Sequence, residues 1–148
     1  MGLEVEINFL KDNKFEIIVP KSGIKAYIDS KSKIGDYSPC APNSSELFLA
    51  SIGGCILYYA KKYFQDIGIS FTKLSVRVWG DWSRVPLQLT DIKVSIFTDA
   101  YINEERKNSF LRFVSNCPVH NTIINTKEIK IFLHQEEFQQ EEFQRDKL

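Results

Sequence analysis

The sequence has no excess of charge of either sign and few cysteines. Its 148 residues carry 19 Lys and Arg against 19 Asp and Glu, and the isoelectric point is near 6.7. This balance argues against nucleic acid or an anionic membrane surface as a partner. Three cysteines, an odd number, suit a reducing compartment better than a fully bridged secreted scaffold. With 43% hydrophobic residues, the chain is predicted to fold as one globular domain without disulfide support.

Signal-peptide and membrane-spanning patterns are also missing. The first residues, Met-Gly-Leu-Glu-Val-Glu, carry acids where a secretory signal peptide carries basic residues. Glu6 stands where a myristoylation motif at Gly2 requires Ser or Thr. The longest apolar stretch, Leu47 to Ala60, is much shorter than the about 20 residues that cross a bilayer. We therefore expect a cytoplasmic protein in which this stretch is buried in protein.

Short segments of alternating apolar and polar residues predict β-strands. The predicted strands span residues 5–9, 15–19, 24–28, 74–78, 92–96 and 129–133. Two main helices interrupt them, the second opening at Asn103. The order of strands, helix, strands, helix, strand indicates an α+β fold with largely antiparallel sheets. Residues 1–134 are assigned to this domain.

An acidic C-terminal tail is expected over residues 135–148. The sequence Gln-Glu-Glu-Phe-Gln occurs there twice, at 135–139 and at 140–144. A five-residue period places Phe138 and Phe143 on different sides of a helix, so the repeat does not form an amphipathic face. The tail is either solvated or docks across a partner subunit.

The first helix is predicted from Asn43 to about Gln65, with Gly68 just beyond its end. Asn43 and Glu46 match the capping-box pattern, in which the two residues satisfy free backbone donors of the first turn. The helix is apolar on nearly every side, so it requires burial on nearly every side. Because a sheet covers only one face of a helix, we predict an extensive homodimer in which a second subunit covers the other.

Two cysteines occupy positions that suit thiol chemistry. Cys55 follows Gly53-Gly54 inside the first helix, where each glycine costs about 1 kcal/mol relative to alanine, so the pair makes room beside the thiol. Cys117 precedes Pro118, which favours the first position of a new helix, so Cys117 is predicted to be its N-cap. The helix dipole and His120 in the same turn both favour thiolate at that place.

Plainer interpretations of these residues stay open. Cys55 also fits a small core residue beside glycines that allow close helix packing, and Cys117 fits a neutral cap beside a surface histidine. Cys40, in a Pro-Cys-Ala-Pro loop, is interpreted as incidental. The cysteines and His120 show no C-x-x-C or H-x-x-x-H spacing, so no metal is expected.

Two motifs together resemble the OsmC/Ohr family of osmotically inducible and organic hydroperoxide resistance proteins. They are Asn-Ser-Ser-Glu-Leu-Phe-Leu-Ala-Ser-Ile-Gly-Gly-Cys at 43–55 and Asn-Cys-Pro-Val-His at 116–120, and they look most like the general OsmC-like branch. The resemblance implies an intertwined homodimer with buried central helices and two active sites near the interface. It implies that Cys55 is peroxidatic and becomes a sulfenic acid. Cys117 would then resolve it as a disulfide, which a dithiol reduces without metal or organic cofactor.

The sequence departs from the family pattern at the groups that activate the first cysteine. Peroxidase members pair a glutamate with an arginine there, whereas Ser45 stands at the glutamate position with Glu46 beside it, and no arginine precedes Arg77. A lysine does not copy the guanidinium fork. Glu46 and His120 are the expected supporting residues. The resemblance implies a thiol-dependent hydroperoxide reductase, and the alternative is a redox-sensing or small-molecule-binding protein without turnover.

Overall fold

The structure is a computed structural model that describes residues 2–30 and 38–135. Its elements run in the order β1 (Glu6–Lys11), β2 (Lys14–Val19), β3 (Ile24–Asp29), α1 (Ser44–Asp66), β4 (Leu74–Arg84), β5 (Leu87–Thr98), α2 (Glu104–Ser115) and α3 (Pro118–Asn125). The strand pairs are antiparallel, which confirms the predicted α+β class. No helix in the described residues has the length and apolar character needed to cross a membrane.

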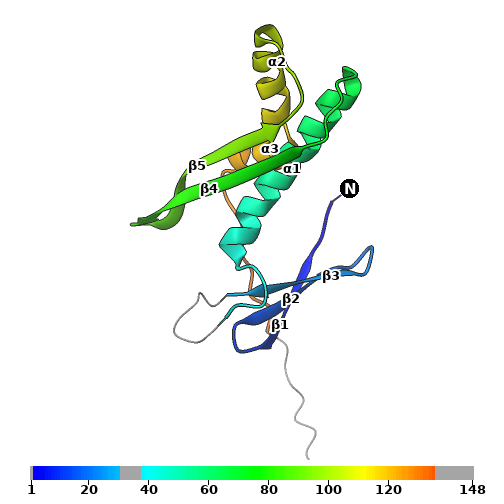
Figure 1. The fold of residues 1–148 in the computed structure, drawn as a ribbon. Helices are drawn as coiled ribbons and strands as arrows, with labels where there is room; N and C mark the ends of the chain where they lie inside the picture. The colour runs from blue at the N-terminus through cyan, green and yellow to red at the C-terminus, as the bar shows by residue number, and fades with distance from the viewer. Residues whose placement is uncertain (1, 31–37, 136–148) are drawn as a thin grey trace, which may run out of the picture.

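The elements form two parts that meet near the start of α1 (Figure 1). The strands β1, β2 and β3 make one sheet in that order, and β4 and β5 make a separate hairpin. The hairpin and α2 both pack on α1, and the short α3 contacts it as well. The long helix α1 is therefore the element on which the other helices and the hairpin assemble.

The core lies between α1 and α2 and is rich in aromatic rings. Phe64 is fully buried and stacks on Phe110, with ring centroids 5.2 Å apart and an interplanar angle of 7°. Tyr63 meets Phe110 edge-on at 5.3 Å. Residues of β4 and β5 pack against this core cluster, whose buried members come from α1 and α2 together with Cys117. The cysteine that precedes α3 is thus part of the core.

The helix α1 begins and ends as the sequence predicts. The Asn43 side chain accepts a hydrogen bond from the Glu46 backbone N–H at 2.9 Å, and the Glu46 carboxylate accepts one from the Asn43 N–H at 2.9 Å. Gly68 follows the C-cap with a φ of +71°, a conformation that glycine adopts at little cost. The predicted capping box and glycine stop are both confirmed.

The sheet of β1–β3 gathers apolar side chains on one face. The register places Phe9, Phe15 and Ile28 side by side. It also places Ile7 beside Ile17 and Ala26. Successive side chains of a strand point to opposite faces, so these residues share a face. Phe9 is 67% exposed and Ile7 is 49% exposed. The described chain therefore leaves much of this apolar face uncovered.

A buried carboxylate fastens this sheet to the segment before α1. Asp29, at the end of β3, is 1% exposed. Its side chain accepts hydrogen bonds from the Cys40 backbone N–H at 3.2 Å and from the Cys40 thiol at 3.6 Å, while its own N–H donates to the Pro42 carbonyl at 3.1 Å. Cys40, which the sequence left without a role, thus helps to hold the two parts together.

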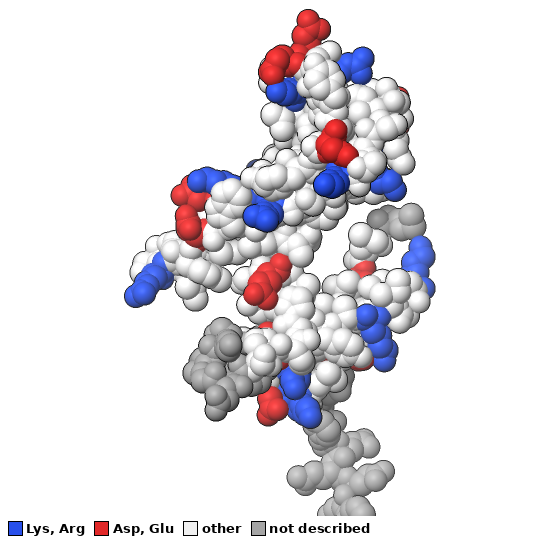
Figure 2. Space-filling view, in the orientation of Figure 1, with Lys and Arg blue, Asp and Glu red and all other residues white. Residues whose placement is uncertain are grey.

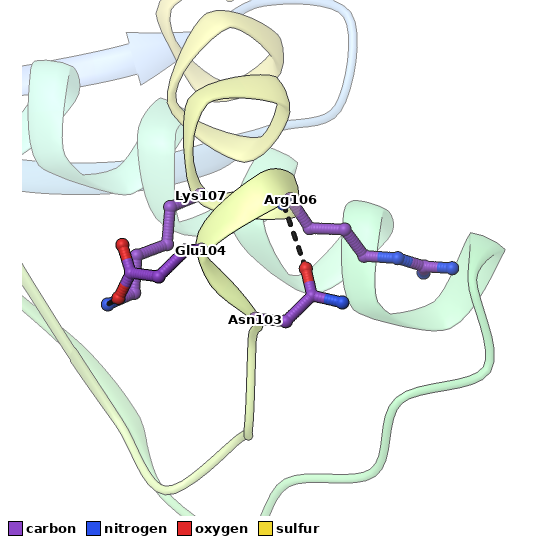
Figure 3. Close-up of polar contacts among 4 residues, drawn as sticks. All are labelled: Asn103, Glu104, Arg106 and Lys107. Atoms are coloured by element: carbon purple, nitrogen blue, oxygen red, sulfur yellow. Dashed lines mark hydrogen bonds and ion pairs between the residues drawn. The ribbon is translucent and has the colours of Figure 1, made fainter.

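The N-terminus of α2 is capped by Asn103, as its sequence predicts (Figure 3). The Asn103 side chain accepts a hydrogen bond from the Arg106 N–H at 2.9 Å. Glu104 forms an ion pair with Lys107 one turn later, at 2.5 Å. The Arg106 side chain extends away from both contacts in Figure 3. The first turn of α2 is therefore stabilised by a cap and by an acidic side chain near the positive end of the helix dipole.

The strand predicted at residues 129–133 is wrong for the described chain. Residues 126–135 carry neither helix nor strand, and Ile129, Ile131 and Leu133 are 82%, 90% and 83% exposed. The apolar alternation is present, but a strand also requires a neighbouring backbone with which to pair, and the described part of the chain supplies none here. The expected C-terminal tail lies outside the described residues from residue 136 onward.

Asp99 joins the end of β5 to the segment that leads into β4. Its carboxylate accepts hydrogen bonds from the backbone N–H groups of Thr72 and Lys73, each at 2.9 Å, and from the Thr72 hydroxyl. These hydrogen bonds favour the charged form and lower the pKa of Asp99 from 3.8 to about 2. The carboxylate therefore stabilises the fold above about pH 4, and this contribution is lost as the pH falls towards 2.

Asp99→Asn is expected to lower the melting temperature at neutral pH and to have progressively less effect as the pH falls from 4 to 2. Thermal unfolding followed by circular dichroism across this range measures the difference between the two proteins. Asp91→Asn is the control, because it removes an exposed carboxyl group from β5 at a positive φ of 49° that asparagine also tolerates. If the difference in melting temperature between Asp99→Asn and the unmodified protein stayed constant down to pH 2, the role assigned to Asp99 would be contradicted.

Candidate functional site

The structure brings Cys55 and Cys117 together, although they lie far apart in the sequence. Cys55 is in the middle of α1, and Cys117 immediately precedes α3. Cys55 packs against the core cluster that contains Cys117, the Cys117 thiol raises the pKa of Cys55, and both cysteines are free. Cys117 is fully buried, with 0% exposure, whereas Cys55 is partly exposed. The pair therefore has one sulfur in the core and one that solvent can reach.

The first turn of α3 brings a backbone amide near each sulfur. Cys117 is the N-cap of α3, as the sequence predicts, and its Sγ accepts from the His120 N–H at 3.4 Å. The Val119 backbone amide favours the thiolate form of Cys55 and so lowers its pKa. The N–H groups of a first helical turn have no partner within the helix, so they are available to such acceptors. Two consecutive amides thus serve two different cysteines.

The pKa of the Cys55 thiol is raised above its ordinary value. Burial is the main cause, since it disfavours the charged thiolate. The Val119 N–H lowers the pKa because it favours the thiolate. The Cys117 thiol raises the pKa further. Among the described residues, the groups that shift the pKa of Cys55 include no lysine or arginine. Activation of Cys55 in one chain therefore depends on a backbone amide.

The predicted supporting residues make other contacts. Glu46 is engaged in the capping box of α1, and it lines a depression beside Gly53, Gly54 and β4. The His120 ring nitrogen Nδ1 lies 2.5 Å from the Ser115 carbonyl. A carbonyl oxygen only accepts, so Nδ1 carries the proton and the ring ties α3 to the end of α2. His120 thus meets Cys117 through its backbone, while its ring contacts α2.

Arg77 and Arg84 lie on β4, and Arg106 lies on α2. The Arg77 guanidinium lies over the Phe97 ring at 5.6 Å from its centroid, on the side of β4 opposite to Val76 and Val78, which approach α1. Arg84 stands at the end of β4. Arg106 is in the first turn of α2, at the opposite end of that helix from Cys117. None of the three is among the groups of this chain that shift the pKa of Cys55.

An apolar groove lies along the same side of α1 as Cys55. It has a volume of about 480 Å³, and its lining includes Ser45 and Phe48 of α1, Trp82 and Leu87 of the hairpin, and Ile123 of α3. Residues 45, 48, 52 and 55 recur at intervals of three and four, so they form one stripe on a helix. Ser45, at the position of the family's glutamate, therefore faces this groove.

Metal ligands are not grouped in the described part of the chain. No cluster of three or more His, Cys, Asp or Glu side chains is arranged there to hold a metal ion. The groups gathered at this site are instead two thiols, two backbone amides and an apolar groove.

Comparison with known proteins identifies relatives. A family model described as OsmC-like protein matches residues 35–132. No curated protein sequence matches the chain. Among solved structures, an OsmC-like protein from Mycoplasma pneumoniae is 20% identical, with a TM-score of 0.71 over 84% of this chain and 89% of that one.

Two further solved structures carry names that refer to hydroperoxides. An organic hydroperoxide resistance protein from Legionella pneumophila is 14% identical, with a TM-score of 0.56 over 84% of this chain and 90% of that chain. An OsmC-like hydroperoxide resistance protein from a Jannaschia species is 16% identical, with a TM-score of 0.54 over 88% and 91%. At these identities the structures show a shared fold.

The match to the family model covers most of the described chain, including α1 with Cys55 and the start of α3 with Cys117. The similarity to the fold of a solved OsmC-like protein agrees with it. This chain therefore belongs to the OsmC-like protein family.

Proposed function

We propose that the protein is a thiol-dependent hydroperoxide reductase in which Cys55 is the peroxidatic residue and Cys117 the resolving residue. The observation that carries the proposal is the contact between a partly exposed and a fully buried thiol at the first turn of α3. The names of the hydroperoxide resistance proteins that share the fold support a peroxide-related role.

The proposed reaction needs only these two sulfurs and an external dithiol. The Cys55 thiolate attacks an oxygen of the hydroperoxide, so an S–O bond forms and the O–O bond breaks. Sulfur is oxidised to a sulfenic acid, and the departing oxygen takes a proton and leaves as an alcohol. The Cys117 thiol then attacks the Cys55 sulfur, releases water and forms a disulfide. A dithiol reductant returns both cysteines to thiols.

The apolar groove favours organic hydroperoxides as substrates. Its lining includes Phe48, Trp82, Leu87 and Ile123, and burial of an alkyl or aryl group contributes about 25 cal/mol per Å² of apolar surface. Hydrogen peroxide gains nothing from such a surface. The volume of about 480 Å³ falls in the range of small-molecule sites.

The test is to treat the reduced protein with cumene hydroperoxide and to map disulfides by peptide mass spectrometry. We expect a disulfide between Cys55 and Cys117, and sustained consumption of the peroxide when dithiothreitol is present. Hydrogen peroxide is the comparison substrate and should react more slowly. A reduced protein that consumes neither peroxide would overturn the proposal.

The raised pKa of Cys55 favours one alternative, a redox-sensing or small-molecule-binding protein without turnover. A thiol that remains largely protonated reacts slowly, since the thiolate is the nucleophile. In that case the same experiment would give stoichiometric oxidation, or no oxidation but retention of an apolar ligand. Steady-state consumption of peroxide would count against this alternative.

We further propose that the protein is an intertwined homodimer, and that residues 1–134 form its OsmC-like domain in the cytoplasm, with 135–148 as a tail. The apolar face of β1–β3 supports the dimer, because the hydrophobic core cluster includes no residue of this sheet among those described. Exposed apolar faces of this kind mark interaction surfaces. Charges of both signs are interspersed over the molecular face in Figure 2, with wide uncharged areas between them.

Phe9→Lys is expected to convert the proposed dimer to a monomer, because it places a charge on the apolar face of the β1–β3 sheet. Light scattering coupled to size-exclusion chromatography should give twice the 17.1 kDa chain mass for the unmodified protein and a single mass for the variant. Asn8→Lys is the matched control, since the adjacent residue points to the other face. An unmodified protein of single mass would contradict the dimer.

A further inference from the structure

The two sulfurs of the cysteine pair differ in ways that bear on how a disulfide between them would be opened. Cys117 is 0% exposed and packs in the core cluster with Ile56 and Val114. Cys55 is partly exposed and lies two helical turns after Phe48, which lines the apolar groove. Because Cys117 is covered by its own chain, association with a second subunit cannot uncover it.

Reduction of a disulfide has a defined geometry. The attacking thiolate approaches one sulfur from the side opposite to the other sulfur, and the second sulfur departs with the electron pair of the broken bond. The attacked sulfur must therefore be open to solvent. The departing sulfur gains from donors already aimed at it, because a thiolate forms there.

We propose that the external dithiol attacks the Cys55 sulfur and that Cys117 departs as a thiolate held by the His120 backbone N–H. This inference rests on the proposed disulfide between the two cysteines. The attacking thiolate forms a new S–S bond to Cys55, the Cys55–Cys117 bond breaks, and Cys117 takes the electron pair. The second thiol of the reductant then attacks the mixed disulfide, so Cys55 leaves as a thiolate and the reductant becomes a cyclic disulfide.

The reverse direction conflicts with two observations. Attack on Cys117 would require the core between α1 and α2 to open, since that sulfur has no exposed surface. It would also place the departing charge on Cys55 rather than on Cys117, whose sulfur already accepts a hydrogen bond from the His120 N–H. Cys117 instead stands at the positive end of α3 with the His120 N–H at 3.4 Å from its sulfur.

The sulfur that the external thiol attacks can be identified from the mixed disulfide that a monothiol forms with the protein. A Cys40→Ser protein is oxidised with diamide, which forms the disulfide without peroxide, and is then treated briefly with glutathione. After the free thiols are blocked with N-ethylmaleimide in acid, peptide mass spectrometry locates both groups. We expect glutathione on Cys55 and N-ethylmaleimide on Cys117, in at least about tenfold excess over the reverse pattern.

Glutathione found mainly on Cys117, or equally on both cysteines, would overturn the inference while leaving the proposed peroxidase intact. Failure of peroxide to react, when diamide still gives a disulfide and the expected pattern, would instead overturn the proposed function alone. Failure of diamide to form the disulfide would overturn both.

A second pair of variants tests the leaving-group role of the His120 amide. His120→Pro removes the N–H but keeps a residue that the first helical turn accepts, and His120→Ala is its matched control because both lose the ring contact with Ser115. Reduction of the preformed disulfide by dithiothreitol should be about tenfold slower in the proline variant than in the alanine variant. Equal rates in two folded variants would contradict this role.

Discussion

Cys55→Ser is expected to reduce turnover of cumene hydroperoxide by about 1,000-fold or more, because a serine hydroxyl does not replace the thiolate nucleophile. Without an external thiol, Cys117→Ser is expected to react once and then stop, since the sulfenic acid on Cys55 has no resolving cysteine with which to form a disulfide. Peroxide consumption in the presence of dithiothreitol measures the first effect. Labelling of the sulfenic acid with dimedone, followed by intact mass spectrometry, measures the second.

Cys40→Ser is the control for both variants, because Cys40 is exposed and its thiol contacts Asp29 rather than the cysteine pair. Its turnover should match that of the unmodified protein. If Cys55→Ser kept its activity while Cys117→Ser lost it, the two roles would have to be exchanged. Full activity in both variants would mean that Cys55 and Cys117 have a structural role only.

Gly53→Ala is expected to lower the free energy of unfolding by up to about 2 kcal/mol, although alanine is the better helix former. A Cβ atom at Gly53 would lie 2.8 Å from Cγ2 of Val78 and 3.2 Å from Cγ2 of Val76, so α1 and β4 would have to move apart. Overpacking of this kind costs about 1–3 kcal/mol, and the helix preference of alanine offsets about 1 kcal/mol of it. Urea unfolding followed by circular dichroism measures the difference.

Gly54→Ala provides the matched comparison within the same helix. No atom of the described chain lies within 4 Å of a Cβ at Gly54, so the substitution should add about 1 kcal/mol of helix preference. Equal losses from the two variants would contradict the close approach of β4 as the reason for Gly53. The sequence predicts that the glycine pair makes room beside Cys55, whereas the structure assigns the first glycine to contact with β4.

The sequence predicted most of the helices and strands because their ends and faces depend on residues that are close together in the chain. The capping box of Asn43 and Glu46 and the Pro118 start of α3 involve residues within one helical turn. Apolar alternation likewise located β1 to β5 to within a few residues at most ends, although the hairpin strands are longer than predicted. The N-cap position of Cys117 followed from the same kind of signal.

The features that the sequence did not predict depend on contacts between distant segments. The Val119 amide reaches Cys55 only because α3 packs against the middle of α1, and no spacing rule describes that packing. The Asp29 contact with Cys40 joins residues on either side of a loop. The strand expected at 129–133 has the right alternation but lacks a pairing backbone within the described chain. Side-chain pattern therefore specifies which face is apolar, while pairing depends on the partner.

The separation between the β1–β3 sheet and the helical core has a consequence for folding. Local contacts within α1, α2 and the hairpin can form a stable unit in a single chain, whereas the sheet shares few contacts with that unit. Regions with few buried contacts open at a lower free-energy cost than the core, so amide protons of β1–β3 should exchange sooner than those of α1. If the chain dimerises as proposed, protection of the sheet should also rise with protein concentration, because association stabilises only the folded sheet. In the proposed dimer, residues 6–29 would thus couple folding to self-association.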